Sequence, residues 1–143
     1  MDKLTALNTQ LANWSVLYVK LHKFHWYVQG PEFFTLHTKF EEFYEDATAF
    51  TDEIAERILT IGEKPLATMK DYLESSQIKE CCCTSATGKE MVQALVADYE
   101  TIVTSSREII ASCEGSDDET ADLFRGKIGE LEKTLWMLKA YLG

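Results

Sequence analysis

Residues 32–61 read EFFTLHTKFEEFYEDATAFTDEIAERILTI, and this stretch has the longest regular apolar pattern in the chain. Its apolar residues recur at intervals of three and four, a spacing typical of one face of an amphipathic helix. They are Phe33, Leu36, Phe40, Phe43, Ala47, Phe50, Ile54 and Ile58. Gly62 and Pro65 follow the run, and both residue types favour the end of a helix. The pattern predicts one long helix from about Glu32 to Ile61.

Three other stretches repeat this periodicity. One begins at Leu4 and ends at Gly30-Pro31, and two lie in the second half of the chain, on either side of Gly115. Ser116 or Asp117 is placed to cap the last of them. Their apolar positions are, in turn, Leu7, Leu11, Trp14, Tyr18, Leu21, His25 and Val28; Val92, Leu95, Tyr99, Ile102 and Ile109; and Ala121, Phe124, Ile128, Leu131, Leu135, Leu138 and Leu142. Four amphipathic helices predict an all-α four-helix bundle.

The connections between these helices differ in length. The first and last links are short, and short links join antiparallel neighbours. Residues 62–88 form a long link with a small apolar group, which consists of Leu66, Met69, Tyr72 and Leu73. A link of this length can run along the bundle and include a short helix, so helices two and three are expected to lie parallel. That is the one-crossover topology of ferritin-like bundles. Residues 1–143 are expected to form a single domain of this kind.

The composition favours a folded protein that attracts cations. Hydrophobic residues make up 45% of the chain and charged residues 27%, while 7 Gly and 2 Pro are too few for a barrel or sandwich of many short strands. The chain has 14 basic and 24 acidic residues, so its net charge is −10. This charge opposes binding to phosphate backbones and anionic lipid. No apolar run reaches the length of a membrane span, so we expect a cytoplasmic protein with no membrane partner.

The four cysteines are Cys81, Cys82, Cys83 and Cys113. Three consecutive cysteines cannot readily converge on one zinc ion or form an ordinary disulfide framework. We interpret the cysteines as incidental thiols, with a redox or metal-binding role for the triplet as the alternative.

Candidate metal ligands lie on the helix of residues 32–61. His37 and Glu41 are one helical turn apart, and so are Asp52 and Glu56, which means that each pair can converge on one ion. All four lie off the apolar stripe, where the alternative is an ordinary solvated acidic face. His25, on the preceding helix, would by itself be interpreted as a hydrogen-bonded core residue.

The distance between the two pairs decides how they can act together. His37 and Asp52 are fifteen residues apart, about 22 Å along a helix, so one chain cannot bring both pairs to one metal ion. If two copies of the helix pack antiparallel across a twofold axis near Asp46, the first pair of one chain meets the second pair of the other. The Glu-x-x-His pairs of conventional di-iron bundles do not occur in this sequence, which favours a shared site.

Several runs of this sequence resemble those of the Dps mini-ferritins, the DNA-binding proteins from starved cells. They are KLHKFHWYVQG at 20–30, FFTLHTKFE at 33–41, TDEIAER at 51–57 and LWMLKAYLG at 135–143. The most specific part is a pair of histidines twelve residues apart, followed at a fixed interval by Asp-x-x-x-Glu. The resemblance spans essentially the whole chain.

The resemblance implies a ferroxidase centre at a dimer interface within a hollow shell of twelve subunits. One chain would supply His25, His37 and Glu41, and its neighbour would supply Asp52 and Glu56. Many members of the family have Asp where Glu41 stands.

Other positions of the family's pattern are also present. Trp26 would lie beside the centre, with an aromatic packed between subunits as the alternative. His22 matches no ligand position of the family. Asp118 and Asp122 match an acidic pore through which iron enters, and their alternative role is that of N-terminal acids favoured by the helix dipole.

The donor set and the resemblance together indicate the chemistry. Imidazole and carboxylate donors suit iron, and also zinc or manganese. The resemblance favours Fe(II), bound singly or as a di-iron pair, oxidised preferably with hydrogen peroxide and stored as ferric mineral, which protects the cell from oxidative damage. Zinc can occupy the same ligands in the isolated protein. A zinc-binding or metal-buffering oligomer without redox turnover and a purely structural helical bundle are the alternatives.

The family's name raises DNA binding as a further function. Relatives that bind DNA often use a Lys-rich terminal tail, whereas here the helical pattern begins almost at Met1 and the sequence stops at Gly143. Together with the net charge of −10, this predicts little or no DNA binding.

Overall fold

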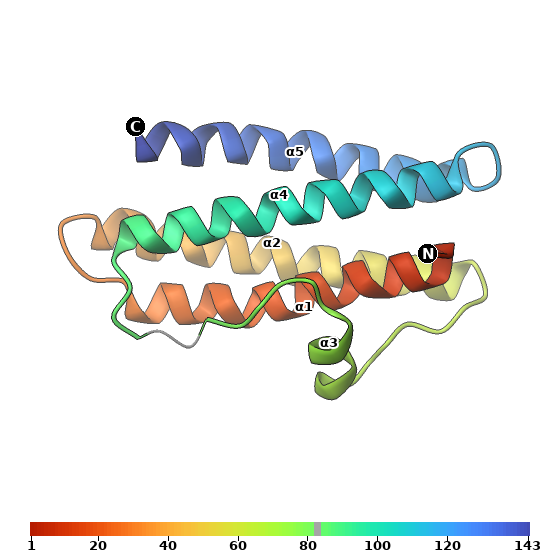
Figure 1. Ribbon diagram of the computed structural model, residues 1–143, viewed down its shortest axis with the longest axis horizontal. Coiled ribbons are helices and arrows are strands. Elements are labelled where there is room, and N and C mark those ends of the chain that lie inside the picture. The colour runs from red at the N-terminus through yellow and green to blue at the C-terminus, as the bar shows by residue number, and fades with distance from the viewer. Residues whose placement is uncertain (82–83) are drawn as a thin grey trace.

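The computed structural model describes residues 1–81 and 84–143, and over those residues it consists of five α-helices and no strands. The helices are α1 (Lys3–Tyr27), α2 (Phe33–Thr60), α3 (Met69–Ser75), α4 (Gly88–Cys113) and α5 (Asp118–Leu142). The four long helices lie side by side, and the short α3 lies outside them against α1 (Figure 1). The predicted all-α bundle is confirmed, and the bounds of α2 match the prediction to within one residue at each end.

The link between α2 and α4 gives the bundle its topology. α1 and α2 run antiparallel, as do α4 and α5 (Figure 1). The link carries α3 back along the outside of α1, so α2 and α4 run in the same direction. The predicted crossover with a short helix is therefore confirmed. Among the described residues, no helix is both long enough and apolar enough to cross a bilayer.

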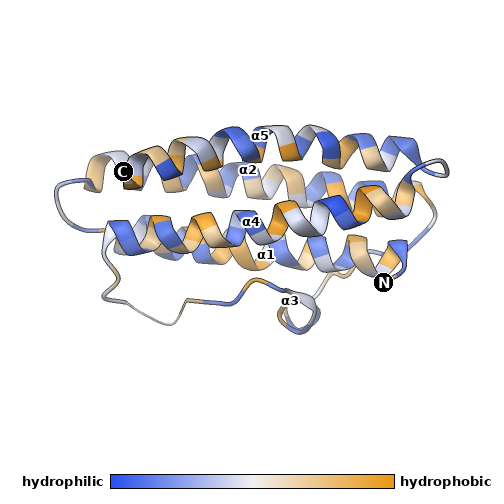
Figure 2. Cartoon of the chain, turned by 45° about the horizontal axis from the view of Figure 1, so that its top comes forward, coloured by the Kyte–Doolittle hydropathy of each residue, from blue (hydrophilic) through white to orange (hydrophobic). Residues whose placement is uncertain are grey.

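The core lies between the four long helices. Hydrophobic and hydrophilic residues alternate along each of them (Figure 2), as expected of amphipathic helices. Trp14, Phe24, Phe40, Tyr99 and Phe124 are among the largest fully buried side chains. The predicted apolar stripe of α1 is wrong at one position, because Tyr18 is 36% exposed. The neighbouring Leu17 is fully buried in its place, because α1 is covered by α2, α3 and α4 and buries a wide arc.

Amide side chains of α1 fix the course of the crossover. Asn8 Oδ1 accepts a hydrogen bond from Leu66 N at 2.9 Å, and Asn13 Oδ1 accepts one from Gln77 N at 2.7 Å. The Gln77 side chain in turn accepts hydrogen bonds from Asn13 and from the Ser105 hydroxyl of α4. Because irregular backbone inside a protein needs partners for its polar groups, these contacts hold the crossover against the bundle.

Asp117 connects the end of α2 to the start of α5. It caps α5 by accepting a hydrogen bond from Thr120 N, as the sequence predicted for this residue or Ser116. Its carboxylate also binds Arg57 of α2 at 3.1 Å and Lys3 of α1 at 3.2 Å. Burial by itself would raise the pKa of Asp117, but the hydrogen bonds from Thr120 and the Lys3 ammonium outweigh it and bring the pKa to about 2.

Candidate metal centre

His25, near the end of α1, and His37, in the second turn of α2, face each other across the hairpin that joins the two helices. Their rings are stacked, with centroids 3.7 Å apart and planes 13° from parallel. His25 Nδ1 lies 2.6 Å from the His37 carbonyl oxygen, and His37 Nδ1 lies 2.7 Å from the His25 carbonyl oxygen. Because a carbonyl oxygen only accepts, each Nδ1 donates, and in the neutral ring Nε2 therefore carries the lone pair. That is the tautomer that metal-binding histidines adopt when their second nitrogen is held in this way.

Glu41 completes the group of donors that one chain brings together. Its Oε1 lies 3.7 Å from His25 Nε2, and its side chain is 48% exposed. Two ligands of one ion, each bonded at about 2.0–2.2 Å, lie roughly this far apart. Phe33 stacks on the outer side of His37, with ring centroids 4.8 Å apart, and so limits the movement of that ring. His25, His37 and Glu41 thus form a half-site with two free imidazole nitrogens and a carboxylate.

The other predicted ligands lie elsewhere on α2. Asp52 and Glu56 are on its exposed side, and fifteen residues of helix separate His37 from Asp52, about 22 Å. Neither carboxylate has a hydrogen-bond or ion-pair partner within the described residues. Over residues 1–81 and 84–143, no three His, Cys, Asp or Glu side chains are arranged to hold a metal ion, so the half-site of His25, His37 and Glu41 is not a complete metal site within one chain. A single chain therefore carries two separate parts of the predicted site.

An aromatic group borders the half-site. His22 stacks on Tyr44 with ring centroids 3.7 Å apart, and Trp26 packs against His22 at 5.1 Å. Trp26 is 68% exposed, and its place beside the centre stays a prediction. Burial and then the charge of His25 lower the pKa of His22, while burial and then Glu41 raise the pKa of Tyr44. Tyr44 was missed by the sequence interpretation, although its position three residues after Glu41 places it on the same helix face.

The two acids of the predicted entry pore are exposed in the first turns of α5. Asp118 accepts a hydrogen bond from Gly115 N at 3.1 Å, and Asp122 pairs with Arg125 at 2.7 Å. These contacts leave both carboxylates at the surface. The pore itself would require several chains and stays a prediction.

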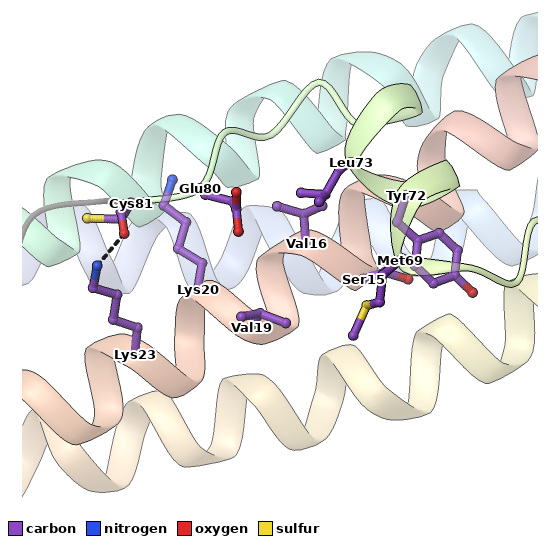
Figure 3. A pocket seen from close by; sticks show the side chains of 10 residues that line it. All are labelled: Ser15, Val16, Val19, Lys20, Lys23, Met69, Tyr72, Leu73, Glu80 and Cys81. Atoms are coloured by element: carbon purple, nitrogen blue, oxygen red, sulfur yellow. Dashed lines mark hydrogen bonds between the residues drawn. The ribbon is translucent and has the colours of Figure 1, made fainter.

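A pocket of about 400 Å³ lies under the crossover, away from these candidate ligands (Figure 3). Its cationic groups are already matched, because Lys20 pairs with Asp98 at 2.7 Å and Lys23 donates to the Cys81 carbonyl oxygen. Its wall includes Cys81, while Cys113 is buried in the core. The interpretation of the cysteines as incidental thiols stays a prediction, and residues 82 and 83 lie outside the described residues.

The family of this chain follows from its similarity to known proteins. A model of the ferritin-like domain matches residues 4–143, so the chain belongs to the ferritin-like family. Within that family it is a Dps mini-ferritin. It is 54% identical over 137 residues to DNA protection during starvation protein 2 of Bacillus anthracis, which covers 95% of this chain and 93% of that protein.

Solved structures agree with this assignment. Dps from Staphylococcus aureus superposes with a TM-score of 0.95 at 42% identity, over 99% of this chain and 95% of that one. Dps from Vibrio cholerae O1 superposes with a TM-score of 0.93 at 39% identity, over 100% and 94% of the two chains. That protein is described as a member of a broad superfamily of ferritin-like diiron-carboxylate proteins. The resemblance to the Dps mini-ferritins is thereby confirmed.

Proposed function

We propose that this Dps protein oxidises Fe(II) with hydrogen peroxide at centres shared between two chains. The observation that carries the proposal is the reciprocal pair of hydrogen bonds between His25 and His37, which leaves both Nε2 atoms free as metal ligands. Glu41 Oε1, 3.7 Å from His25 Nε2, adds a carboxylate of the kind that suits iron.

The remaining ligands come from a second copy. Asp52 and Glu56 of the partner subunit complete the centre when two α2 helices pack antiparallel. A twofold axis makes the two contacts equivalent, so each dimer holds two centres. The exposure of both carboxylates, without a partner in the described part of their own chain, supports this arrangement.

The chemistry that such a centre performs is a two-electron reduction of peroxide. Two Fe(II) ions each give up one electron, and one hydrogen peroxide takes up both electrons with two protons and leaves as two water molecules. Because the O–O bond is broken by two electrons, no hydroxyl radical is released. The carboxylates stabilise the higher charge of the Fe(III) that forms, as oxygen ligands favour hard cations.

The oxidised iron is stored as ferric mineral inside a hollow shell of twelve chains in the cytoplasm. Asp118 and Asp122 line the pore through which Fe(II) enters, and the net charge of −10 per chain favours the approach of cations. The same charge opposes DNA, so protection rests on the removal of iron and peroxide.

The test is anaerobic loading of the purified protein with Fe(II), followed by stoichiometric hydrogen peroxide. Ferric absorbance and particle size are recorded together. We expect rapid oxidation, with the iron held in solution inside a large particle. Oxidation no faster than in buffer would contradict the proposal, and tight zinc binding without iron oxidation would favour a metal-buffering oligomer.

A further inference from the structure

Tyr44 occupies a position on α2 from which it touches two of the three donors in the half-site. Its hydroxyl donates a hydrogen bond to Glu41 Oε1 over 3.4 Å. Its ring meets the edge of His25, with centroids 5.4 Å apart and planes at 80°. The same Glu41 oxygen lies 3.7 Å from His25 Nε2, so Tyr44 and His25 both lie beside this carboxylate oxygen.

Of the three donors, the Glu41 carboxylate is the least constrained, so an orienting contact has the largest effect on it. Both imidazole rings are held by hydrogen bonds to carbonyl oxygens and by their own stacking. The Glu41 side chain is 48% exposed and has three torsions to fix, so binding a metal costs it more side-chain entropy than the histidines lose. A donor that already orients the carboxylate reduces that cost, as the outer contacts of metal ligands do.

His22 holds the Tyr44 ring in place. The two rings stack with centroids 3.7 Å apart and planes 19° from parallel, and Tyr18 closes against the edge of His22 at 4.6 Å. Both ring nitrogens of His22 are shielded from solvent and have no hydrogen-bond partner among the described residues. The contact therefore depends on the flat face of the ring rather than on its nitrogens.

We propose that Tyr44, held by the stacked ring of His22, is a positioning residue that keeps the Glu41 carboxylate turned toward His25 for metal binding. This role rests on the proposed function of the centre. Tyr44 acts on the metal site by orienting Glu41, and His22 acts on it by holding Tyr44. Neither residue is a metal ligand.

The experiment measures the affinity of the assembled protein for Co(II), which binds such donors and is followed by its visible absorbance. Tyr44→Phe keeps the ring and removes the hydroxyl, and we expect about tenfold weaker binding, the lower end of the range for outer contacts of metal ligands. In a Glu41→Ala background the same change should have no further effect, because the residue through which Tyr44 acts is gone. Equal losses in both backgrounds would overturn the proposal.

His22 provides the second test. His22→Ala should weaken Co(II) binding as Tyr44→Phe does, and His22→Phe should restore it, because phenylalanine offers the same flat face. Failure of His22→Phe to restore binding would overturn the role assigned to stacking. Tyr141→Phe is the matched control, since it removes a phenol hydroxyl from α5, which contributes no residue to the half-site.

Particle size and far-UV circular dichroism are recorded for every variant, so that a loss of fold is separated from a loss of affinity. If His37→Ala binds Co(II) as tightly as the wild-type protein does, the proposed centre is overturned, and the positioning role with it. Wild-type binding that requires His37 but is unchanged by Tyr44→Phe would overturn the positioning role alone.

Discussion

The two parts of the candidate centre lie toward the two ends of α2, and they differ in how far contacts within the chain hold them in place. At the first end, His37 is held by a carbonyl oxygen, by the ring of His25 and by Phe33, and its neighbour Glu41 receives a hydrogen bond. At the second end, Asp52 and Glu56 are exposed and have no side-chain partner within the described residues. One chain therefore orders the imidazole part by its own contacts, whereas nothing in the described part of that chain fixes the carboxylate part.

The largest expected effect is on the rate of Fe(II) oxidation. Substitutions at the two ends of α2 should lower this rate equally, although the two ends differ in structure. His37→Ala and Asp52→Asn should each lower the rate of peroxide-dependent Fe(II) oxidation by at least about 100-fold, beyond the usual loss for an outer contact. Glu53→Gln, which removes the exposed carboxylate next to Asp52, is the control and should keep the wild-type rate. Wild-type activity in either ligand variant would show that the substituted residue is not a ligand of the centre.

The same variants should differ in stability. His37→Ala removes stacking and a hydrogen bond and should lower the free energy of unfolding by about 1–3 kcal/mol. Asp52→Asn changes a surface side chain and should stay within about 0.5 kcal/mol of wild type. Chemical denaturation of both variants measures the difference, and an equally large loss for Asp52→Asn would show that the second end is also organised within the chain.

A smaller effect concerns the contact that anchors the second end of α2. Arg57, next to Glu56, binds Asp117, and Asp117→Asn removes this ion pair while it preserves a residue that can cap α5. We expect a loss of about 1–2 kcal/mol at neutral pH, because hydrogen bonds to charged groups are stronger than neutral ones.

The pH dependence of this variant has a defined sign. The pKa of Asp117 is lowered from 3.8 to about 2, so its contribution is complete above the unfolded-state value and is lost as the pH falls from about 4 to about 2. The stability difference between wild type and Asp117→Asn should therefore shrink over that interval. A difference that stays constant down to pH 2 would contradict the assigned role of the Asp117 carboxylate.

The smallest effect separates the entry of iron from its binding. Changing Asp118 and Asp122 together to Asn should slow Fe(II) uptake a few-fold at low ionic strength, and added salt should remove the difference by screening. The equilibrium affinity for Co(II) should not change, because neither residue belongs to the half-site. Uptake that is equally fast at low salt would leave these acids only the role of N-terminal acids favoured by the helix dipole.

Much of the fold could be predicted because the sequence repeats one local rule. Apolar spacing gave the long helices, and the length of the link after Gly62 gave the crossover. The rule placed Tyr18 in the core, whereas Leu17 is buried there, because contacts from three sides widen the buried arc of α1. The hydrogen bonds of Asn8 and Asn13 to the crossover could not be predicted, since they depend on tertiary contacts between distant segments.

The site was predicted in part for a similar reason. The spacing of His37, Glu41, Asp52 and Glu56 follows from helix geometry, and it predicts a site shared with a second chain. The hydrogen bonds that fix the histidine tautomers join residues twelve positions apart, and no local pattern reveals them. The same holds for the stacking of His22 on Tyr44, which brings together residues of two helices.

Each centre is proposed to take ligands from two chains, and co-expression of two inactive variants tests this sharing of ligands. When His37→Ala and Asp52→Asn chains assemble at random, half of the dimers are mixed, and each mixed dimer contains one centre with all its ligands intact. About a quarter of the wild-type oxidation rate should return. His37→Ala mixed with Glu41→Ala is the control, because both changes affect the same half-site and no intact centre can form. Recovery in the first mixture alone is the predicted result, and a first mixture as inactive as its separate variants would contradict the shared centre.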